Sequence, residues 1–219
     1  LLNFDIKNDL DETFSPWDFT TDNVGNIYVL GSTYNAMEVI NSYHFYHGLI
    51  FKFNQAGIFL ETIDLGLHHQ NSMTMLVSDS LGNLYYNLRT VDLEYQIHKM
   101  LPNGNVITVV DDLEQGYGSL SCLTDIEIDS NGNIYLATCP NWIEISSAKY
   151  DPSGELLFKF ETNPKSQHQN LSQIKIGTDG KIYAFGHDST YFTQTQGMLL
   201  FRDKFVEDNV PPVITPIDD

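Results

Sequence analysis

Four residues with a common spacing are the first candidates for chemistry in this sequence. Asp18, Met75, Asp125 and Gln173 each stand seven positions before the glycine of a repeated motif. Carboxylate and amide oxygens are the ligands that Ca²⁺ prefers. We expect no cofactor; the less favoured possibility is a Ca²⁺ site, with Asp18 and Asp125 as metal ligands or as acid and base groups. Met75 interrupts the set, and the alternative is that the polar members only hydrate an inner strand.

Aromatic and histidine side chains form a second group of candidates. They lie in long segments expected to be loops on one face of the domain, above all between Ser32 and Gly48. Aromatic rings with polar edges suit recognition of a protein or a carbohydrate, because they bury a large area at low entropic cost. The alternatives are that the rings fold the loops onto the domain, or, less favoured, that histidines bind zinc. The predicted ligand-binding residues are Tyr34, Tyr43, His44, Phe45, Tyr46, His47, His68, His69, Trp142 and Tyr191.

Two cysteines, Cys122 and Cys139, lie at equal distances from the centre of the turn Asp129–Gly132. Directly opposed residues of an antiparallel pair are close enough at Cα for a disulfide. We predict a disulfide between them, with two buried thiols as the alternative. The same positions in the first repeat are Ser15 and Ser32.

Composition and motifs exclude several functions. The chain has 219 residues and a net charge of -18, which repels nucleic acid and anionic membrane surfaces. It has no apolar run long enough for insertion into a membrane. No glycine-rich phosphate loop, HExxH, GxSxG or CxxC motif occurs. The composition is typical of a secreted protein, and the chain is expected not to be an enzyme.

One motif is written four times, and its repetition predicts the elements that carry these residues. Its glycines are 57, 50 and 48 residues apart. Apolar segments that end in Asp, Asn or Ser precede each copy, so each unit predicts a hairpin whose turn glycine accepts a positive φ. The four copies are Gly25–Tyr28, Gly82–Tyr85, Gly132–Tyr135 and Gly180–Tyr183.

A second hairpin follows in the first three units, with Gly57, Gly104 and Gly154 at its turn. Two hairpins make a four-stranded antiparallel sheet, and such a sheet repeated about every 50 residues is typical of propeller blades. We therefore predict an all-β propeller of four blades. A β-sandwich is less favoured, because it does not repeat one hairpin four times.

The fourth unit offers only three strands, whereas residues 1–6 resemble an outer strand. We expect this N-terminal strand to join the last blade and close the ring, which removes sheet edges. The alternative is that the chain is part of a larger propeller. The predicted propeller spans 1–207, followed by a Pro-rich linker or the start of an Ig-like module at 208–219. The blades are expected at about 14–66, 71–111, 121–162 and 171–206.

The units resemble bacterial SBBP repeats, which are related to the NHL type. The resemblance rests on Asp22–Thr33, Phe51–Gly57 and Asp64–Gly66, and it covers about residues 1–205. Lys181 departs from it, since it replaces an Asn. The tail 210–216 resembles the entry of the Ig-like modules that follow propellers in large surface proteins. The resemblance implies one domain of a longer adhesin-like chain, whose other domains are partners.

The function expected from these observations is an extracellular binding, adhesion or scaffold module on a bacterial cell surface, with its partner docked on the long-loop face. Two alternatives remain open. One is a propeller hydrolase or lyase with a divalent cation at the channel mouth, and the other is a purely structural spacer. Propellers host many unrelated tasks, so the fold does not choose among them.

Overall fold

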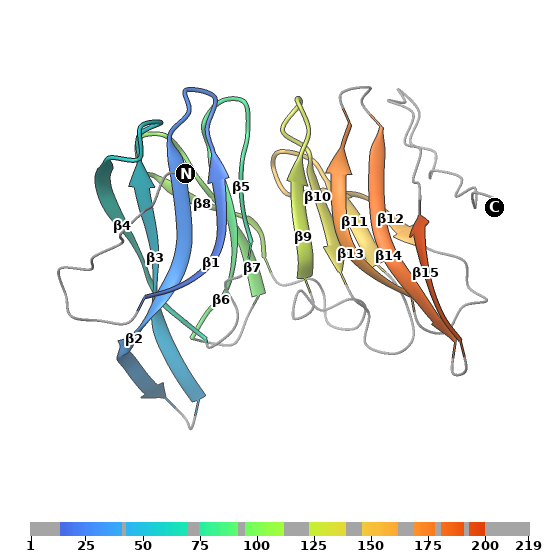
Figure 1. Ribbon diagram of the computed structural model, residues 1–219, viewed down its shortest axis with the longest axis horizontal. Coiled ribbons are helices and arrows are strands. Elements are labelled where there is room, and N and C mark those ends of the chain that lie inside the picture. Colours follow the sequence, from blue (N-terminus) through green and yellow to red (C-terminus); the bar gives the residue numbers. More distant parts are fainter. Residues whose placement is uncertain are drawn as a thin grey trace. The chain divides into compact units, whose positions relative to one another are not determined.

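The repeated hairpins are present as antiparallel strands in the computed structural model (Figure 1). Every regular element in the described residues is a β-strand, so the predicted all-β class is confirmed. These residues contain no helix that is long and apolar enough to cross a membrane. The structure describes residues 14–40, 43–69, 75–91, 95–111, 123–138, 146–161, 169–177, 181–190 and 193–199.

The chain divides into two compact units, Leu1–Asp111 and Asp112–Asp219. Unit 1 contains two four-stranded sheets with strands in sequence order. Sheet 1 consists of β1 (Phe14–Thr21), β2 (Ile27–Ile40), β3 (Tyr43–Phe53) and β4 (Phe59–His69). Sheet 2 consists of β5 (Leu76–Ser78), β6 (Leu84–Arg89), β7 (Tyr95–Met100) and β8 (Val106–Val110).

Unit 2 contains a four-stranded and a three-stranded sheet. Sheet 3 consists of β9 (Leu123–Ile128), β10 (Ile134–Thr138), β11 (Ser146–Tyr150) and β12 (Leu156–Glu161). Sheet 4 consists of β13 (Gln169–Ile176), β14 (Ile182–Thr190) and β15 (Thr193–Leu199). The strand expected at residues 1–6 and the linker expected at 208–219 lie outside the described residues.

The tight hairpin turns form as the glycines predict. Gly25 has a φ of 86°, and its N–H donates to the Asp22 carbonyl at 3.1 Å. Asp22 in turn donates its own N–H to the carbonyl of Asn26 at 3.0 Å, which closes the turn. A side chain at this φ is strained, so glycine is required. The glycines at 57, 82, 104, 132 and 154 repeat this conformation.

A β-bulge recurs in the first strand of three sheets. The antiparallel ladder of β1 with β2 shifts between Pro16 and Asp18, so that Trp17 is the extra residue. The ladders of β9 and β13 shift in the same way at Thr124 and Ser172. A bulge bends the strand and redirects the side chain beside it. The residue that follows each bulge is one of the four that share the seven-residue spacing.

Within unit 1, sheets 1 and 2 pack face to face. Tyr28, Leu30 and Ile50 of sheet 1 form one buried cluster with residues of sheet 2 that include Leu76 and Tyr86. Successive residues of a strand point to opposite faces of its sheet. The other face of sheet 1 is also apolar, with Leu49, Phe51 and Phe53 buried beside Phe14, Ile27 and Val29.

Unit 2 is built in the same way, because β13 lies against β9 and β10. Its buried residues include Ile126 on β9, Ile134 and Leu136 on β10, and Ile174 on β13. The first strand of sheet 4 therefore lies beside the first strand of sheet 3, as β5 lies beside β1 in unit 1.

Candidate functional site

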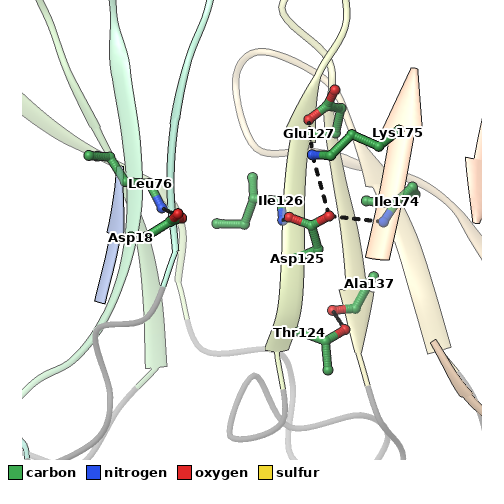
Figure 2. A network of polar contacts seen from close by, with 9 residues as sticks. All are labelled: Asp18, Leu76, Thr124, Asp125, Ile126, Glu127, Ala137, Ile174 and Lys175. Carbon is green, nitrogen blue, oxygen red and sulfur yellow. Dashed lines mark hydrogen bonds and ion pairs between the residues drawn. The ribbon is translucent and has the colours of Figure 1, made fainter. Parts of the chain in front are cut away.

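Asp18, the first candidate metal ligand, joins two sheets of unit 1 (Figure 2). Its Oδ1 accepts the N–H of Phe19 at 2.8 Å, and its Oδ2 accepts the N–H of Leu76 at 2.8 Å. Leu76 begins β5, so the carboxylate connects the first strands of sheets 1 and 2. The bulge at Trp17 immediately precedes Asp18, whose side chain makes this contact between sheets.

Asp125 makes the equivalent contacts in unit 2. Its two oxygens accept the N–H of Ile126 at 3.0 Å and the N–H of Ile174, on β13, at 2.9 Å. Lys175 adds an ion pair at 3.5 Å to Asp125 and one at 3.1 Å to Glu127. Burial raises the pKa of Glu127, and the positive charge of Lys175 opposes that shift. Figure 2 shows these side chains converging between β9 and β13.

Hydrogen bonding at the other two equivalent positions is different. The N–H of Met75 donates to Oδ1 of Asn87 at 2.9 Å, and Gln173 is exposed. Cations repel N–H donors, and both oxygens of Asp18 and of Asp125 already face such donors. The contacts thus fit a hydrogen-bond acceptor better than a metal ligand. Among the described residues, no three His, Cys, Asp or Glu side chains form a group that could hold a metal ion.

A second set of aspartates, which sequence reasoning missed, organises the hairpin turns. Asp79 accepts the N–H groups of Leu81 and Asn83 at 2.9 Å each, the Asn83 amide at 2.6 Å and the Tyr85 hydroxyl at 3.2 Å. The ammonium of Lys99 lies 5.2 Å from the centre of the Tyr85 ring. The signal was present, because Asp, Asn and Tyr recur at fixed offsets, and each Lys stands five residues before the glycine of the next turn. The equivalent groups are Asp22, Asn26, Tyr28 and Lys52, and Asp129, Asn133, Tyr135 and Lys149.

Sheet 4 has neither the Asp nor the Asn of this set. Gly177 stands at the position of the Asp, and Lys181 at that of the Asn. The backbone bond that closes the turn is kept, from the N–H of Gly177 to the Lys181 carbonyl at 2.7 Å. The departure that the sequence shows at Lys181 is therefore paired with a second substitution.

The segment that was expected to be the longest loop is an extended hairpin, and that interpretation was wrong. β2 continues to Ile40, and β3 begins at Tyr43. We call residues 33–40 and 43–47 the arm. Val39 and Ile40, then Tyr43 and Phe45, are β-branched or aromatic residues on either side of a turn, which is the signal that could have found it.

The arm separates its aromatic residues into two groups. Phe45 and Tyr46 are 1% and 7% exposed and belong to the core. Tyr43 and Val39, by contrast, are 44% and 59% exposed. Phe45 and Tyr46 are therefore anchors rather than contact residues. Tyr34 lies in β2, His44 is exposed, and Trp142 and Tyr191 lie outside the described residues.

Pairing of β3 with β4 brings several of the candidates together. Phe45 lies opposite His69, and Tyr46 lies opposite His68. The His69 ring is 5.5 Å from the Tyr43 ring and 5.6 Å from the Phe45 ring. Nδ1 of His47 is 3.4 Å from Oδ1 of Asp64. Eight of the ten predicted ligand-binding residues therefore lie on the arm or on β4 beside it.

The comparisons assign no family. No protein-family model matches the chain, and no curated protein matches it. A crystal structure of a protein of unknown function from Bacteroides caccae is similar, with a TM-score of 0.49 and 11% sequence identity. The match covers 84% of this chain and 59% of that chain.

The chemistry that the arm offers follows from its exposed side chains. They include the apolar side chain of Val39, the phenol of Tyr43, the imidazole of His44 and the carboxylate of Glu38, which offer a stacking surface and hydrogen bonds. His68, on β4 beside the arm, is by contrast 2% exposed, and burial lowers its pKa to about 4. The two cysteines expected to form a disulfide lie outside the described residues.

Proposed function

We propose that the chain is a β-propeller binding module of the SBBP type, which acts at a bacterial cell surface and contacts a protein or carbohydrate through its arm. The observation that carries the proposal is the exposure of Val39 and Tyr43 on a hairpin anchored by buried Phe45. A rigid aromatic side chain on a fixed strand binds at low entropic cost.

The packing of the sheets supports the propeller. In unit 1, the face of sheet 1 that carries Tyr28 packs against the face of sheet 2 that carries Tyr86. Tyr85, which is equivalent to Tyr28, points to the opposite face of sheet 2, because neighbouring residues of a strand alternate. The face of Tyr28 in sheet 1 therefore meets sheet 2, whereas the equivalent face of sheet 2 points away from sheet 1. Repetition of such a contact is what arranges blades around an axis.

A binding assay tests the proposal. The full chain is applied to a glycan array and to a panel of immobilised extracellular matrix proteins. We expect a ligand in one of the two panels, and a Tyr43→Ser variant that binds it at least tenfold more weakly, equivalent to about 1.4 kcal/mol. The matched control is Ile107→Ser, which removes a comparably exposed apolar side chain from β8.

Two results would contradict the proposal. One is the absence of binding in both panels, which would favour the spacer. The other is equal weakening by Tyr43→Ser and Ile107→Ser, because the arm would then have no special part in binding. Thermal unfolding of both variants checks that the fold is retained.

A further inference from the structure

Three histidines lie on successive rungs where the arm meets β4. The antiparallel pairs are Phe45 with His69, Tyr46 with His68, and His47 with Leu67. One imidazole therefore comes from β3 and two from β4. All three are within the segment that holds the arm against its neighbouring strand.

His68 is the buried member of the three. It is 2% exposed, and its Nδ1 is 2.9 Å from the carbonyl oxygen of His69. A carbonyl only accepts hydrogen bonds, so Nδ1 carries the proton of the neutral ring. Protonation of the ring would place a charge in a site that is almost free of solvent, which is costly.

The charged groups on the arm and on the strands packed against His68 belong to β2, β3, β4 and β6. On β3 and β4, His47 and His69 act on it, and a proton on either ring opposes a proton on His68. Asp64 is paired with His47 and also accepts the Gly66 N–H at 2.8 Å. His44 and Glu38 are exposed on the arm itself. Arg89, which lies 4.8 Å from the Tyr95 ring, ends β6, the strand of sheet 2 beside β4.

Acid should loosen this contact. Burial, with smaller contributions from His47 and His69, lowers the pKa of His68 from 6.5 to about 4. The closed form therefore favours neutral His68. Its stabilisation is complete at pH values above 6.5, where the ring is neutral in both forms, and it is lost as the pH falls from 6.5 through 4. At pH 5, the equilibrium between open and closed rungs should shift about 30-fold toward the open form.

We propose that the three histidine rungs form a pH-sensitive latch, which holds the arm on β4 at neutral pH and opens more readily near pH 5. The closed latch fixes Phe45 against His69, and the open latch frees the strand that carries Tyr43. The device depends on the pairing of β3 with β4 and not on the identity of any ligand.

Amide hydrogen exchange of the full chain at pH 7.5 and pH 5.0, corrected for the intrinsic pH dependence of exchange, tests the latch. We expect opening of residues 43–47 and 67–69 to increase about 30-fold at pH 5.0. In His68→Phe, which keeps a buried ring without a titrating nitrogen, the increase should disappear. The control is His98→Phe on β7, where burial also lowers a histidine pKa, and this variant should keep the increase.

The latch is overturned if His68→Phe retains the increase, or if residues 43–47 open no more than β9 and β10 do. Should His68→Phe fail to fold, NMR titration of the unmodified chain replaces it. Protonation of His68 must then coincide with shifts of the arm amides. Protonation of His68 that leaves the arm amides unmoved would equally overturn the proposal.

Discussion

The aspartates of this chain act mainly as hydrogen-bond acceptors for its own backbone. Asp22, Asp79 and Asp129 each collect four donors within one hairpin. Asp18 and Asp125 instead reach the first strand of the next sheet. A charged acceptor forms stronger hydrogen bonds than a neutral one, which suits a contact between sheets.

Replacing Asp18 or Asp125 with Ala should lower the free energy of unfolding by about 2 kcal/mol, because the N–H of Leu76 or Ile174 loses its acceptor. Urea denaturation measures the change. Glu38→Ala, on an exposed position, is the control and should change stability by less than about 0.5 kcal/mol.

Thermal unfolding in the presence of Ca²⁺ or EDTA separates this hydrogen-bonding role of Asp18 and Asp125 from metal binding. Ca²⁺ and EDTA should leave the melting temperature of the unmodified chain unchanged. A Ca²⁺-dependent increase that Asp18→Ala abolishes would restore the cation site and argue against a purely structural carboxylate.

Spacing alone located Asp18 and Asp125 correctly as equivalent residues, but it could not show what they contact. Their partners depend on the bulges at Trp17 and Thr124, which change the local register, and on packing between sheets. Neither is encoded by the pattern of polar and apolar residues in one strand. The residue type of Asp18 and Asp125 therefore suggested metal binding, whereas their carboxylates accept hydrogen bonds from the backbone of the next sheet.

Individual strands followed the sequence closely where tight turns defined them. The hairpins around Gly25, Gly82 and Gly132 formed as expected, since glycine and aspartate specify the turn locally. The arm was missed because its length differs from that of the other repeats, and the comparison of repeats favoured a loop. Burial of Phe45 and Tyr46 depends on pairing with β4, a contact between strands that the pattern does not show.

The cysteine prediction belongs to one element, the hairpin of β9 and β10. The last described pair of this ladder is Leu123 with Thr138, after a shift at Thr124. One further step in the same register would pair Cys122 with Cys139. In sheet 1, the equivalent serines, Ser15 and Ser32, are directly paired.

We therefore expect mass spectrometry of the non-reduced protein to find no alkylatable thiol. Reduction should lower the free energy of unfolding by about 3 kcal/mol, as for a loop of this length. A Cys122→Ser, Cys139→Ser double variant should be insensitive to reductant. Two alkylated thiols in the untreated protein would show the prediction to be wrong.

At the scale of the whole molecule, one apolar face of sheet 1 is only partly covered. It is apolar on both faces, and a sheet of this kind is stable when both faces are covered. Sheet 2 covers the face of Tyr28, whereas Phe19 and Phe59, on the other face, are 69% and 52% exposed. The proposed propeller supplies a further blade for that face.

Small-angle X-ray scattering of the monomer tests the ring. A compact chain of 219 residues should have a radius of gyration of about 17 Å. An open arc of four sheets would be longer and give a clearly larger value. Such a result would favour the alternative in which this chain is part of a larger propeller.

The alternation of Asp18, Met75, Asp125 and Gln173 also bears on how a gene of this kind can grow. In each sheet that carries Asp, the carboxylate accepts a backbone N–H from the following sheet, and that sheet carries Met or Gln at the equivalent position. Duplication of a single sheet would place two of one kind in succession and break the order, whereas duplication of a pair would preserve it. We therefore predict that homologous genes differ in length by steps of about 100 codons, twice the repeat of roughly 50 residues.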